Sequence, residues 1–302
     1  MTQALPFQAF LEVTRKCNQS CPFCSCPWFA EGGHDLSPEL EIAEWEEVAT
    51  EIVANGVRHI AVTGGEPTLK EGVPHLMEHI ARLLEEYDST TLALFTNGKN
   101  FNGEWTDILS SCNAECYTSL PGLSSFSALT GVHDADFRSV LKVINDCATN
   151  DIRVSVGVTV CRPMLHELHE TLSYAVLSGA QTIVLNLFKP TGRGASHPEL
   201  LLSEAEIAEA AAVAEEVAER CKGACAFVGE FPPIVVPEDY PHLAMEFGCM
   251  AAKGTFTVAP DGWLHVCEHD AEGVCHWRDW RKGVQSDKWR CFQFGVHPVC
   301  PL

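Results

Sequence analysis

The chain has 302 residues, 46% of them hydrophobic, and a formal net charge of −21. This length fits one large domain with a small one, and no apolar run approaches the roughly 20 residues of a membrane helix, which excludes a membrane protein. The charge excludes binding along a nucleic-acid backbone, because that requires a surplus of basic residues, and we interpret it as a solubility feature.

The cysteine content indicates the cellular compartment. The chain has fifteen cysteines, and its first residues lack the basic stretch followed by an apolar one that marks an export signal. A cysteine-rich chain without such a signal favours a reducing compartment, and metal ligation over disulfides. We therefore expect a cytoplasmic, metal-binding protein.

Segments of strand length alternate with segments of helix length along the first two thirds of the chain. The expected strands are 7–13, 59–63, 91–96, 114–119, 153–160 and 182–187, and the expected helices are 37–55, 73–86, 105–111, 135–150, 166–178 and 203–220. The first helix is expected to begin at Ser37 and Pro38, and the last carries a capping box, Ser203 with Glu206. Such alternation predicts a parallel sheet, and six units are too few for a closed eight-fold barrel. The expected fold class is α/β, an open partial (β/α)6 TIM barrel with its chemistry at the C-terminal ends of the strands.

Three cysteines lie within eight residues, directly after the first expected strand: Cys17, Cys21 and Cys24. Three thiolates on one loop can hold three irons of a cubane cluster and leave the fourth iron without a protein ligand. A reactive metal site keeps such an open position, whereas a structural one closes its shell. A zinc knuckle and a disulfide framework are the alternatives. We interpret Cys26 as a bystander, because a residue so close to Cys24 is expected to point away along an extended loop.

A second motif, Thr63-Gly64-Gly65-Glu66-Pro67, follows the second expected strand. Glycines let a ligand approach the backbone closely, and a carboxylate offsets an ammonium group. Together with the Cys-x3-Cys-x2-Cys spacing, this motif resembles the radical S-adenosylmethionine (radical SAM) enzymes. The resemblance implies a 4Fe-4S cluster on the three clustered cysteines and binding of the amino end of SAM by Gly64, Gly65 and Glu66.

Later strand ends carry weaker signals. The resemblance implies cofactor contacts for Asn97 and Ser119, which close the third and fourth expected strands. Cys161 ends the fifth strand, facing the expected active site, where a thiol can give a hydrogen atom to a substrate radical. The segment 190–194, Pro-Thr-Gly-Arg-Gly, resembles one found in family members with a C-terminal SPASM or twitch domain. The segment 166–170, His-Glu-Leu-His-Glu, has the wrong spacing for a metalloprotease, and we interpret it as a solvated helix face.

The composition changes after a proline-rich connection, which predicts three parts: a radical SAM partial barrel over 1–220, a linker over 221–243, and a small cysteine-rich domain over 244–302. Asp261-Gly262 predicts a hairpin turn between Cys249 and Cys267, and this spacing resembles the hairpin that opens SPASM and twitch domains. The resemblance implies one auxiliary 4Fe-4S cluster, with the expected ligands Cys249, Cys267, Cys291 and Cys300. Cys275 lies in an apparent half-buried strand and is the alternative to Cys291 or Cys300, and a zinc site is the alternative to the cluster.

The resemblance implies an enzyme that reductively cleaves SAM to a 5′-deoxyadenosyl radical, which abstracts a hydrogen atom from the substrate. We expect a maturase of a ribosomally made peptide; the alternatives are a dehydrogenase of a small alcohol or sugar metabolite and, more remotely, a non-enzymatic iron–sulfur or zinc protein. An external electron donor such as flavodoxin or ferredoxin is implied. Because only six residues precede the first expected strand, we expect any leader peptide to be recognised by a separate protein. Neither nucleic acid nor membrane is an expected partner.

Overall fold

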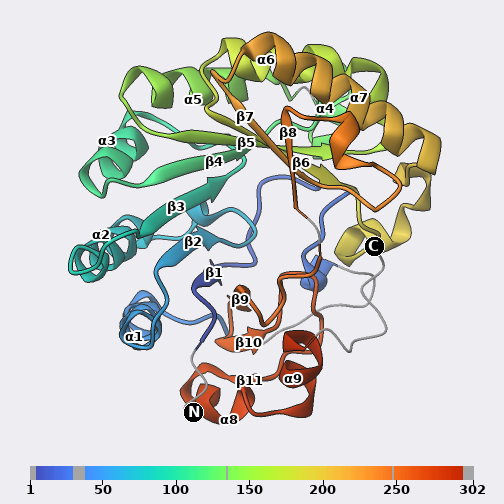
Figure 1. Cartoon of the computed structure of the whole chain (residues 1–302). Helices are drawn as coiled ribbons and strands as arrows, with labels where there is room; N and C mark the ends of the chain where they lie inside the picture. Colours follow the sequence, from blue (N-terminus) through green and yellow to red (C-terminus); the bar gives the residue numbers. More distant parts are fainter. Residues whose placement is uncertain (1–4, 30–37, 134, 247, 295–302) are drawn as a thin grey trace.

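A single curved sheet organises the molecule (Figure 1). The computed structural model describes residues 5–29, 38–133, 135–246 and 248–294. The sheet has eleven strands in the order β11-β10-β9-β1-β2-β3-β4-β5-β6-β7-β8, so it is open rather than closed. Each strand from β1 to β8 pairs in parallel with the next, and β9 pairs in parallel with β1. At that edge, β10 pairs antiparallel with both β9 and β11. The strands are β1 Gln8–Glu12, β2 His59–Thr63, β3 Thr91–Thr96, β4 Glu115–Ser119, β5 Val154–Val160, β6 Thr182–Leu187, β7 Ala226–Glu230, β8 Leu243–Glu246, β9 Thr255–Val258, β10 Trp263–His265 and β11 Cys275–His276.

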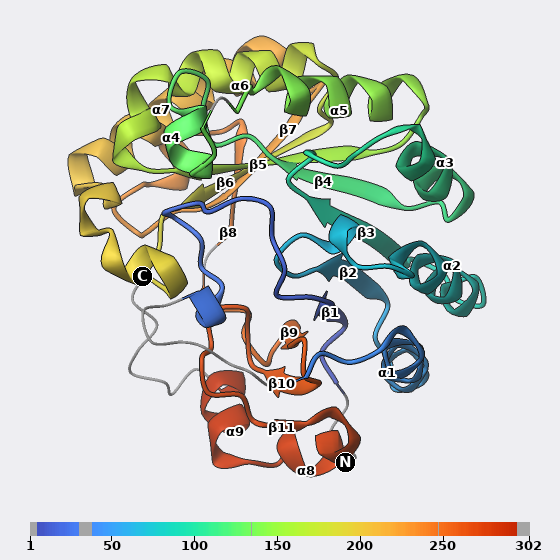
Figure 2. The same ribbon diagram turned by 180° about the vertical axis from the view of Figure 1, so that it is seen from behind.

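Most of the helices cover the convex face of the sheet, as Figures 1 and 2 show from opposite sides. Apolar side chains of the strands and helices form one buried core. None of the described helices combines the length and the apolar composition needed to cross a membrane. The helices are α1 Ile42–Ala54, α2 Val73–Leu84, α3 Gly103–Ser111, α4 Phe126–Thr130, α5 Arg138–Thr149, α6 Leu168–Leu177, α7 Glu204–Cys221, α8 Trp280–Gly283 and α9 Asp287–Gln293.

The predicted fold class is confirmed: β1 to β6 alternate with helices in an open parallel barrel. Strands β2, β3 and β6 match the predicted ranges residue for residue. The predicted start of the first helix is wrong, because α1 begins at Ile42 with Glu41 and Glu44 as its capping box, and Ser37 lies outside the described residues. The capping box of Ser203 and Glu206 is present at the start of α7.

The C-terminal third continues the same sheet at both edges. The range 221–243, predicted as a linker, contains β7 and the start of β8, which extend the parallel sheet beyond β6. At the opposite edge, β9 pairs in parallel with β1. Strand β9 therefore lies beside β1, although the two are far apart in sequence (Figure 1).

Aromatic rings fill the middle of the barrel. Phe95 stacks on Tyr117 with ring centroids 4.1 Å apart, and Phe10 meets Phe95 edge-on at 5.9 Å. A cavity of about 230 Å³ lies on one side of these rings and is bounded by strand starts, among them Gln8 and His59. The rings therefore separate this cavity from the C-terminal ends of the strands, where the cysteine loop lies.

A buried carboxylate holds the segment between β4 and α4. Glu167 is only 7% exposed, and its oxygens accept hydrogen bonds from the backbone N–H groups of Leu123, Ser124 and Ser125, and from both serine hydroxyls. The interpretation of 166–170 as a solvated face is right for His166 and Glu170 but wrong for Glu167. The sequence could not show this, because the partners of Glu167 are more than forty residues away in the chain.

Glu167→Gln is expected to destabilise the protein in a pH-dependent way. Burial alone raises the pKa of Glu167, but the hydrogen bonds from Ser124 and Ser125 outweigh burial and lower it to about 2. A depressed folded-state pKa contributes stability above the unfolded value of about 4.3, and this contribution is lost as the pH falls toward 2. Hydrogen bonds to a charged group contribute about 1.5–3 kcal/mol each, so we expect a loss of at least about 2 kcal/mol at pH 7.

Thermal unfolding of the cluster-free protein at pH 7 and pH 3 tests this expectation. The gap between wild type and Glu167→Gln should be wide at pH 7 and smaller at pH 3. The matched control is Glu170→Gln, which changes an exposed carboxylate three residues away. Equal stability of all three proteins at pH 7 would contradict the role of Glu167.

Candidate active site

The cysteine loop follows β1 and lies across the C-terminal end of the barrel (Figure 2). A turn within the loop is closed by a hydrogen bond from the Cys24 N–H to the Cys21 carbonyl (3.1 Å). The loop is tied to the end of α4, because the Ser20 N–H donates to the Thr130 carbonyl at 2.9 Å. Sequence reasoning missed α4, which has only five residues. This short helix is therefore part of the support of the site.

The three predicted cluster ligands lie on one loop, and the turn from Cys21 to Cys24 sets two of them close together in the chain. Burial raises the pKa of Cys17 and of Cys21, whereas a hydrogen bond from Cys26 lowers the pKa of Cys24 to about 7. Thiolates are the ligands that iron–sulfur clusters use, so this group of side chains fits the donor set of such a cluster.

Cys26 does not point away from the other thiols, and the geometric reason for interpreting it as a bystander is wrong. Its thiol donates to Cys24 and lies 3.9 Å from the Gly64 carbonyl oxygen. The short helix Pro27–Phe29 turns the chain directly after Cys26, so the loop is not extended here. Cys26 is therefore a neighbour of the predicted ligands.

The glycine-rich motif after β2 packs directly on the cysteine loop. The Gly65 N–H donates to the Thr14 carbonyl and the Glu66 N–H to the Lys16 carbonyl, both at 2.7 Å. A Cβ atom on Gly64 would lie 2.5 Å from the Thr14 oxygen, and one on Gly65 would overlap the Lys16 carbonyl. Gly64 also has φ +137°, which side chains disfavour. The two glycines are needed for this close approach of two backbones.

The Glu66 carboxylate is buried at the ends of β2 and β3. One oxygen, Oε1, accepts from the Thr68 and Thr96 hydroxyls at 2.6 and 2.8 Å, and Oε2 accepts from the Asn97 N–H at 2.7 Å. Burial raises the pKa of Glu66, and these hydrogen bonds oppose that shift. Each carboxylate oxygen has two acceptor positions, and the hydrogen bond from Asn97 uses one of those of Oε2 within the described part of the chain. A buried carboxylate with such an oxygen fits an ammonium group, such as the amino end of SAM.

The remaining predicted residues near the cofactor lie at three different strand ends. Asn97 follows β3, and its Nδ2 donates to Asn18 Oδ1 at 2.8 Å and lies 3.9 Å from Cys17 Sγ. Ser119 ends β4 and pairs with Gly157 of β5. Cys161 is fully buried in the hydrophobic core, and burial raises its pKa to about 12. Its thiol is therefore not exposed at the strand ends in this structure.

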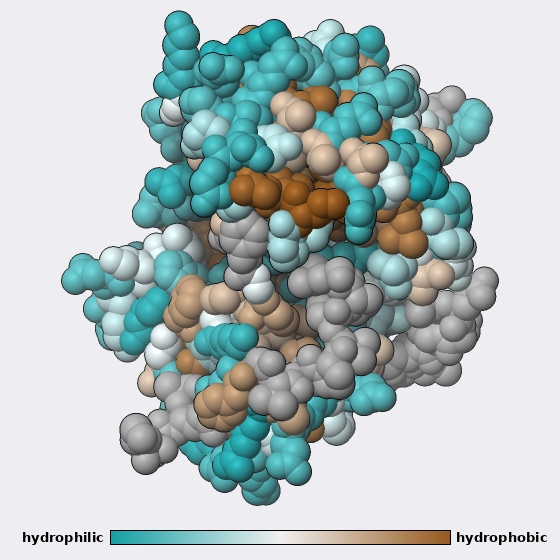
Figure 3. Space-filling view, turned by 45° about the vertical axis from the view of Figure 1, so that its right-hand side comes forward, coloured by the Kyte–Doolittle hydropathy of each residue, from teal (hydrophilic) through white to brown (hydrophobic). Residues whose placement is uncertain are grey.

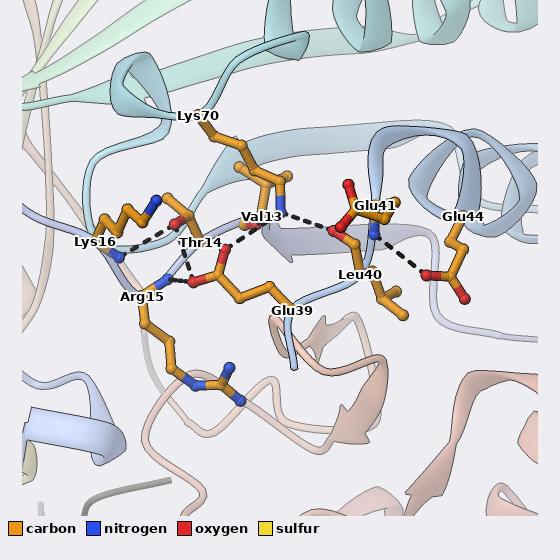
Figure 4. Close-up of polar contacts among 9 residues, drawn as sticks. All are labelled: Val13, Thr14, Arg15, Lys16, Glu39, Leu40, Glu41, Glu44 and Lys70. Atoms are coloured by element: carbon orange, nitrogen blue, oxygen red, sulfur yellow. Dashed lines mark hydrogen bonds and ion pairs between the residues drawn. The ribbon is translucent and has the colours of Figure 1, made fainter. Parts of the chain in front are cut away.

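A polar network supports the base of the cysteine loop (Figure 4). Glu39 accepts from the Thr14 hydroxyl at 3.1 Å and from the Arg15 N–H at 2.8 Å. The Lys70 ammonium group donates to the Val13 carbonyl at 2.8 Å and pairs with Glu39 at 3.3 Å. These contacts fix the chain between β1 and Cys17 on both sides.

Glu12 is a site residue that the sequence analysis missed. It is 5% exposed at the end of β1, and burial, followed by the nearby Glu268 and Cys24, raises its pKa. Its signal in the sequence is an acidic residue that directly follows the apolar residues 9–11 of the strand. The C-terminal segment also reaches the start of the cysteine loop, because Asp261 pairs with Arg15 at 3.3 Å.

The predicted hairpin in the C-terminal segment is present. Gly262 has φ +83° in the turn between β9 and β10, which pair antiparallel. Cys249 precedes this hairpin in the chain and Cys267 follows it, and burial raises the pKa of Cys267 to about 12. Cys291 lies on α9 and is half-buried. Cys300 falls outside the described residues.

Cys275 lies on β11 and packs against α8. Its sulfur occupies the space that a side chain at Gly283 would need, which agrees with its interpretation as part of a half-buried strand. Across the described ranges, no three His, Cys, Asp or Glu side chains are arranged to hold a single metal ion.

The chain is similar to known proteins in both sequence and structure. The family model described as "Radical SAM superfamily" matches residues 11–175. The PqqA peptide cyclase of Ruegeria pomeroyi is 27% identical over 281 residues, 91% of this chain and 71% of that protein. The sporulation killing factor maturation protein SkfB of Bacillus subtilis is 27% identical over 177 residues, 58% of this chain and 41% of SkfB. The structure of Streptococcus suis SuiB bound to its precursor peptide SuiA has a TM-score of 0.72 at 14% identity, covers 98% of this chain and 67% of SuiB, and shows the same fold.

Proposed function

Because this chain belongs to the radical SAM superfamily, we propose that it is a peptide maturase that abstracts a hydrogen atom from a ribosomally made peptide. Membership of the family implies SAM and a 4Fe-4S cluster as cofactors. When bound, they supply a 5′-deoxyadenosyl radical, which removes a hydrogen atom from an unactivated carbon. The protein's own residues hold both cofactors, position the substrate carbon and exclude water.

The proposed cluster ligands are Cys17, Cys21 and Cys24, and the donor set supports this assignment. Glu66 is proposed to accept the ammonium group of SAM at Oε2, since a carboxylate oxygen has two acceptor positions and the Asn97 N–H uses one of them. Gly64 and Gly65 hold this carboxylate against the cysteine loop. Asn97, Ser119 and Cys161 are proposed to face the cofactor and substrate from neighbouring strand ends.

We further propose that residues 244–302 form a domain that holds one auxiliary 4Fe-4S cluster. Its proposed ligands are Cys249, Cys267, Cys291 and Cys300. The hairpin of β9 with β10, which lies between Cys249 and Cys267 in the chain, supports the first pair, and the position of Cys275 against Gly283 supports leaving it out. Iron near eight per chain after anaerobic reconstitution is expected for two cubane clusters, and bound zinc would contradict this assignment.

The peptide substrate rests on one observation: the PqqA peptide cyclase, which matches over 91% of this chain, is named for action on a peptide. The surface gives supporting detail. Figure 3 shows a band of apolar surface across the middle of a mostly hydrophilic face. Separately, the connection between β7 and β8 carries two exposed aliphatic side chains, Ile234 and Val236, each 46% exposed. Exposed apolar surface of this kind is typical of sites that bind other chains.

The experiment is anaerobic turnover with SAM, dithionite and short peptides encoded beside this gene. The proposal predicts 5′-deoxyadenosine, faster formation of it with the cognate peptide, and a mass change in that peptide. A scrambled peptide of the same composition is the control. Acceleration by small alcohols or sugars instead would establish the dehydrogenase alternative. Replacement of dithionite by reduced flavodoxin or ferredoxin tests the proposed electron donor. A separate leader-binding protein, if one takes part, should lower the peptide concentration needed for half-maximal turnover.

A further inference from the structure

The connection after β6 lies on top of the cysteine loop. The Gly194 N–H donates to the Cys24 carbonyl at 3.2 Å. Gly192 has φ +56°, and a Cβ atom there would lie 2.5 Å from the Cys26 carbonyl oxygen. Two short helices meet at this contact, Pro27–Phe29 from the cysteine loop and Gly192–Ser196 from the connection. The sequence analysis noted this Pro-Thr-Gly-Arg-Gly segment but gave it no role.

Arg193 is the charged residue of this contact, and it is held in two ways. Its Nη1 donates to the Cys21 carbonyl at 3.0 Å. Its guanidinium carbon lies 4.6 Å from the ring centroid of Phe29, in cation–π geometry. Arg193 is half-buried, so its charge is only partly screened by water. The position of the charge is therefore fixed relative to the loop.

Both basic and acidic side chains lie around the loop, and Lys99 donates to the Asn18 carbonyl at 3.4 Å. The Glu66 carboxylate accepts from the Asn97 N–H at 2.7 Å, and the Asn97 side chain lies 3.9 Å from Cys17 Sγ. Arg193, in contrast, contacts the backbone of a proposed ligand directly, at the Cys21 carbonyl. The chain as a whole has a net charge of −21. A cation fixed against the Cys21 carbonyl therefore stabilises negative charge on the loop.

We propose that Arg193 is a positioning residue whose fixed positive charge raises the reduction potential of the cluster on the cysteine loop. Uptake of one electron makes a cluster more negative, and a nearby cation stabilises that reduced form by Coulomb attraction. Net charge and hydrogen bonding around the sulfurs set such potentials. The inference rests on the proposed function, because it requires a cluster on Cys17, Cys21 and Cys24.

The test is a potentiometric titration, monitored by electron paramagnetic resonance, of anaerobically reconstituted full-length protein without SAM. The signal of this cluster is identified in a parallel sample as the one that changes when SAM is added. Wild type is compared with Arg193→Met, which removes the charge, and with Arg193→Lys, which keeps it. The matched control is Arg162→Met, which removes an exposed cation paired with Glu206.

Arg193→Met is expected to lower the ratio of reduced to oxidised cluster about tenfold at a fixed potential, a shift of about 59 mV for one electron. Arg193→Lys and Arg162→Met should remain near wild type. Equal potentials for Arg193→Met and Arg162→Met overturn the inference. If Arg193→Met binds no iron, the decision falls to Arg193→Lys. A cluster with the wild-type reduction potential in Arg193→Lys supports the role of the charge. Loss of iron in Arg193→Lys as well overturns the inference. A wild-type protein without a SAM-responsive signal overturns the proposed function itself.

Discussion

Replacing Cys21 by alanine is expected to abolish SAM cleavage and to remove one of the two proposed clusters. Cys21 lies between the other two predicted ligands, and the turn from Cys21 to Cys24 orients both thiols. Changes to residues that only support metal ligands cost about 10- to 100-fold in metal affinity, so loss of a ligand should cost more than about 100-fold. The measurements are iron per chain, expected to fall from about eight to about four, and 5′-deoxyadenosine, expected to fall to background.

The matched control is Cys221→Ala, which removes a half-buried thiol at the end of α7. It should keep both the iron content and the rate of wild type. The assignment of the cluster would be wrong if Cys21→Ala retained full iron and formed 5′-deoxyadenosine at the wild-type rate.

Gly65→Ala is expected to give the second largest effect. The added methyl group would overlap the Lys16 carbonyl, which lies next to Cys17 in the chain. Overpacking of this kind costs about 1–3 kcal/mol of stability, and a displacement of about 1 Å at a catalytic site can cost about 100-fold in rate. We therefore expect SAM cleavage to slow by about 100-fold, even in protein that has bound its full iron.

Gly103→Ala is the control for this change, because a Cβ at Gly103 meets no other atom within 4 Å. This residue begins α3, where alanine favours the helix. Thermal unfolding and 5′-deoxyadenosine formation are measured for both variants. Wild-type turnover by Gly65→Ala would show that the contact between the two loops is not needed.

The barrel could be predicted from the sequence because its strands are apolar runs of the right length, each followed by a helical pattern. The range 59–63, His-Ile-Ala-Val-Thr, is such a run, and the structure places β2 there. The strands β7 and β8 were not predicted, because a proline-rich connection at Pro232 and Pro233 separates two short segments that become strands only by pairing with β6 and with each other.

The motifs of the site were visible in the sequence, but their mutual support was not. Spacing alone grouped Cys17 with its neighbours and marked the Gly-Gly-Glu motif. The contact of Gly65 with Thr14 joins residues that are far apart in the sequence, and Arg193 and Cys21 are 172 residues apart. The position of Cys26 was misjudged for the same reason, since the turn after it is fixed by packing against the connection after β6. Such long-range contacts carry no periodic or local signal.

The central claim is that one iron of the cluster on the cysteine loop has no protein ligand and binds SAM. The most direct measurement is electron paramagnetic resonance of the reduced, fully reconstituted protein before and after addition of SAM. An open iron that takes up the amino and carboxylate groups of SAM predicts a changed signal. An identical signal in a protein that holds its full iron would contradict the claim, because it would mean that SAM does not reach the cluster.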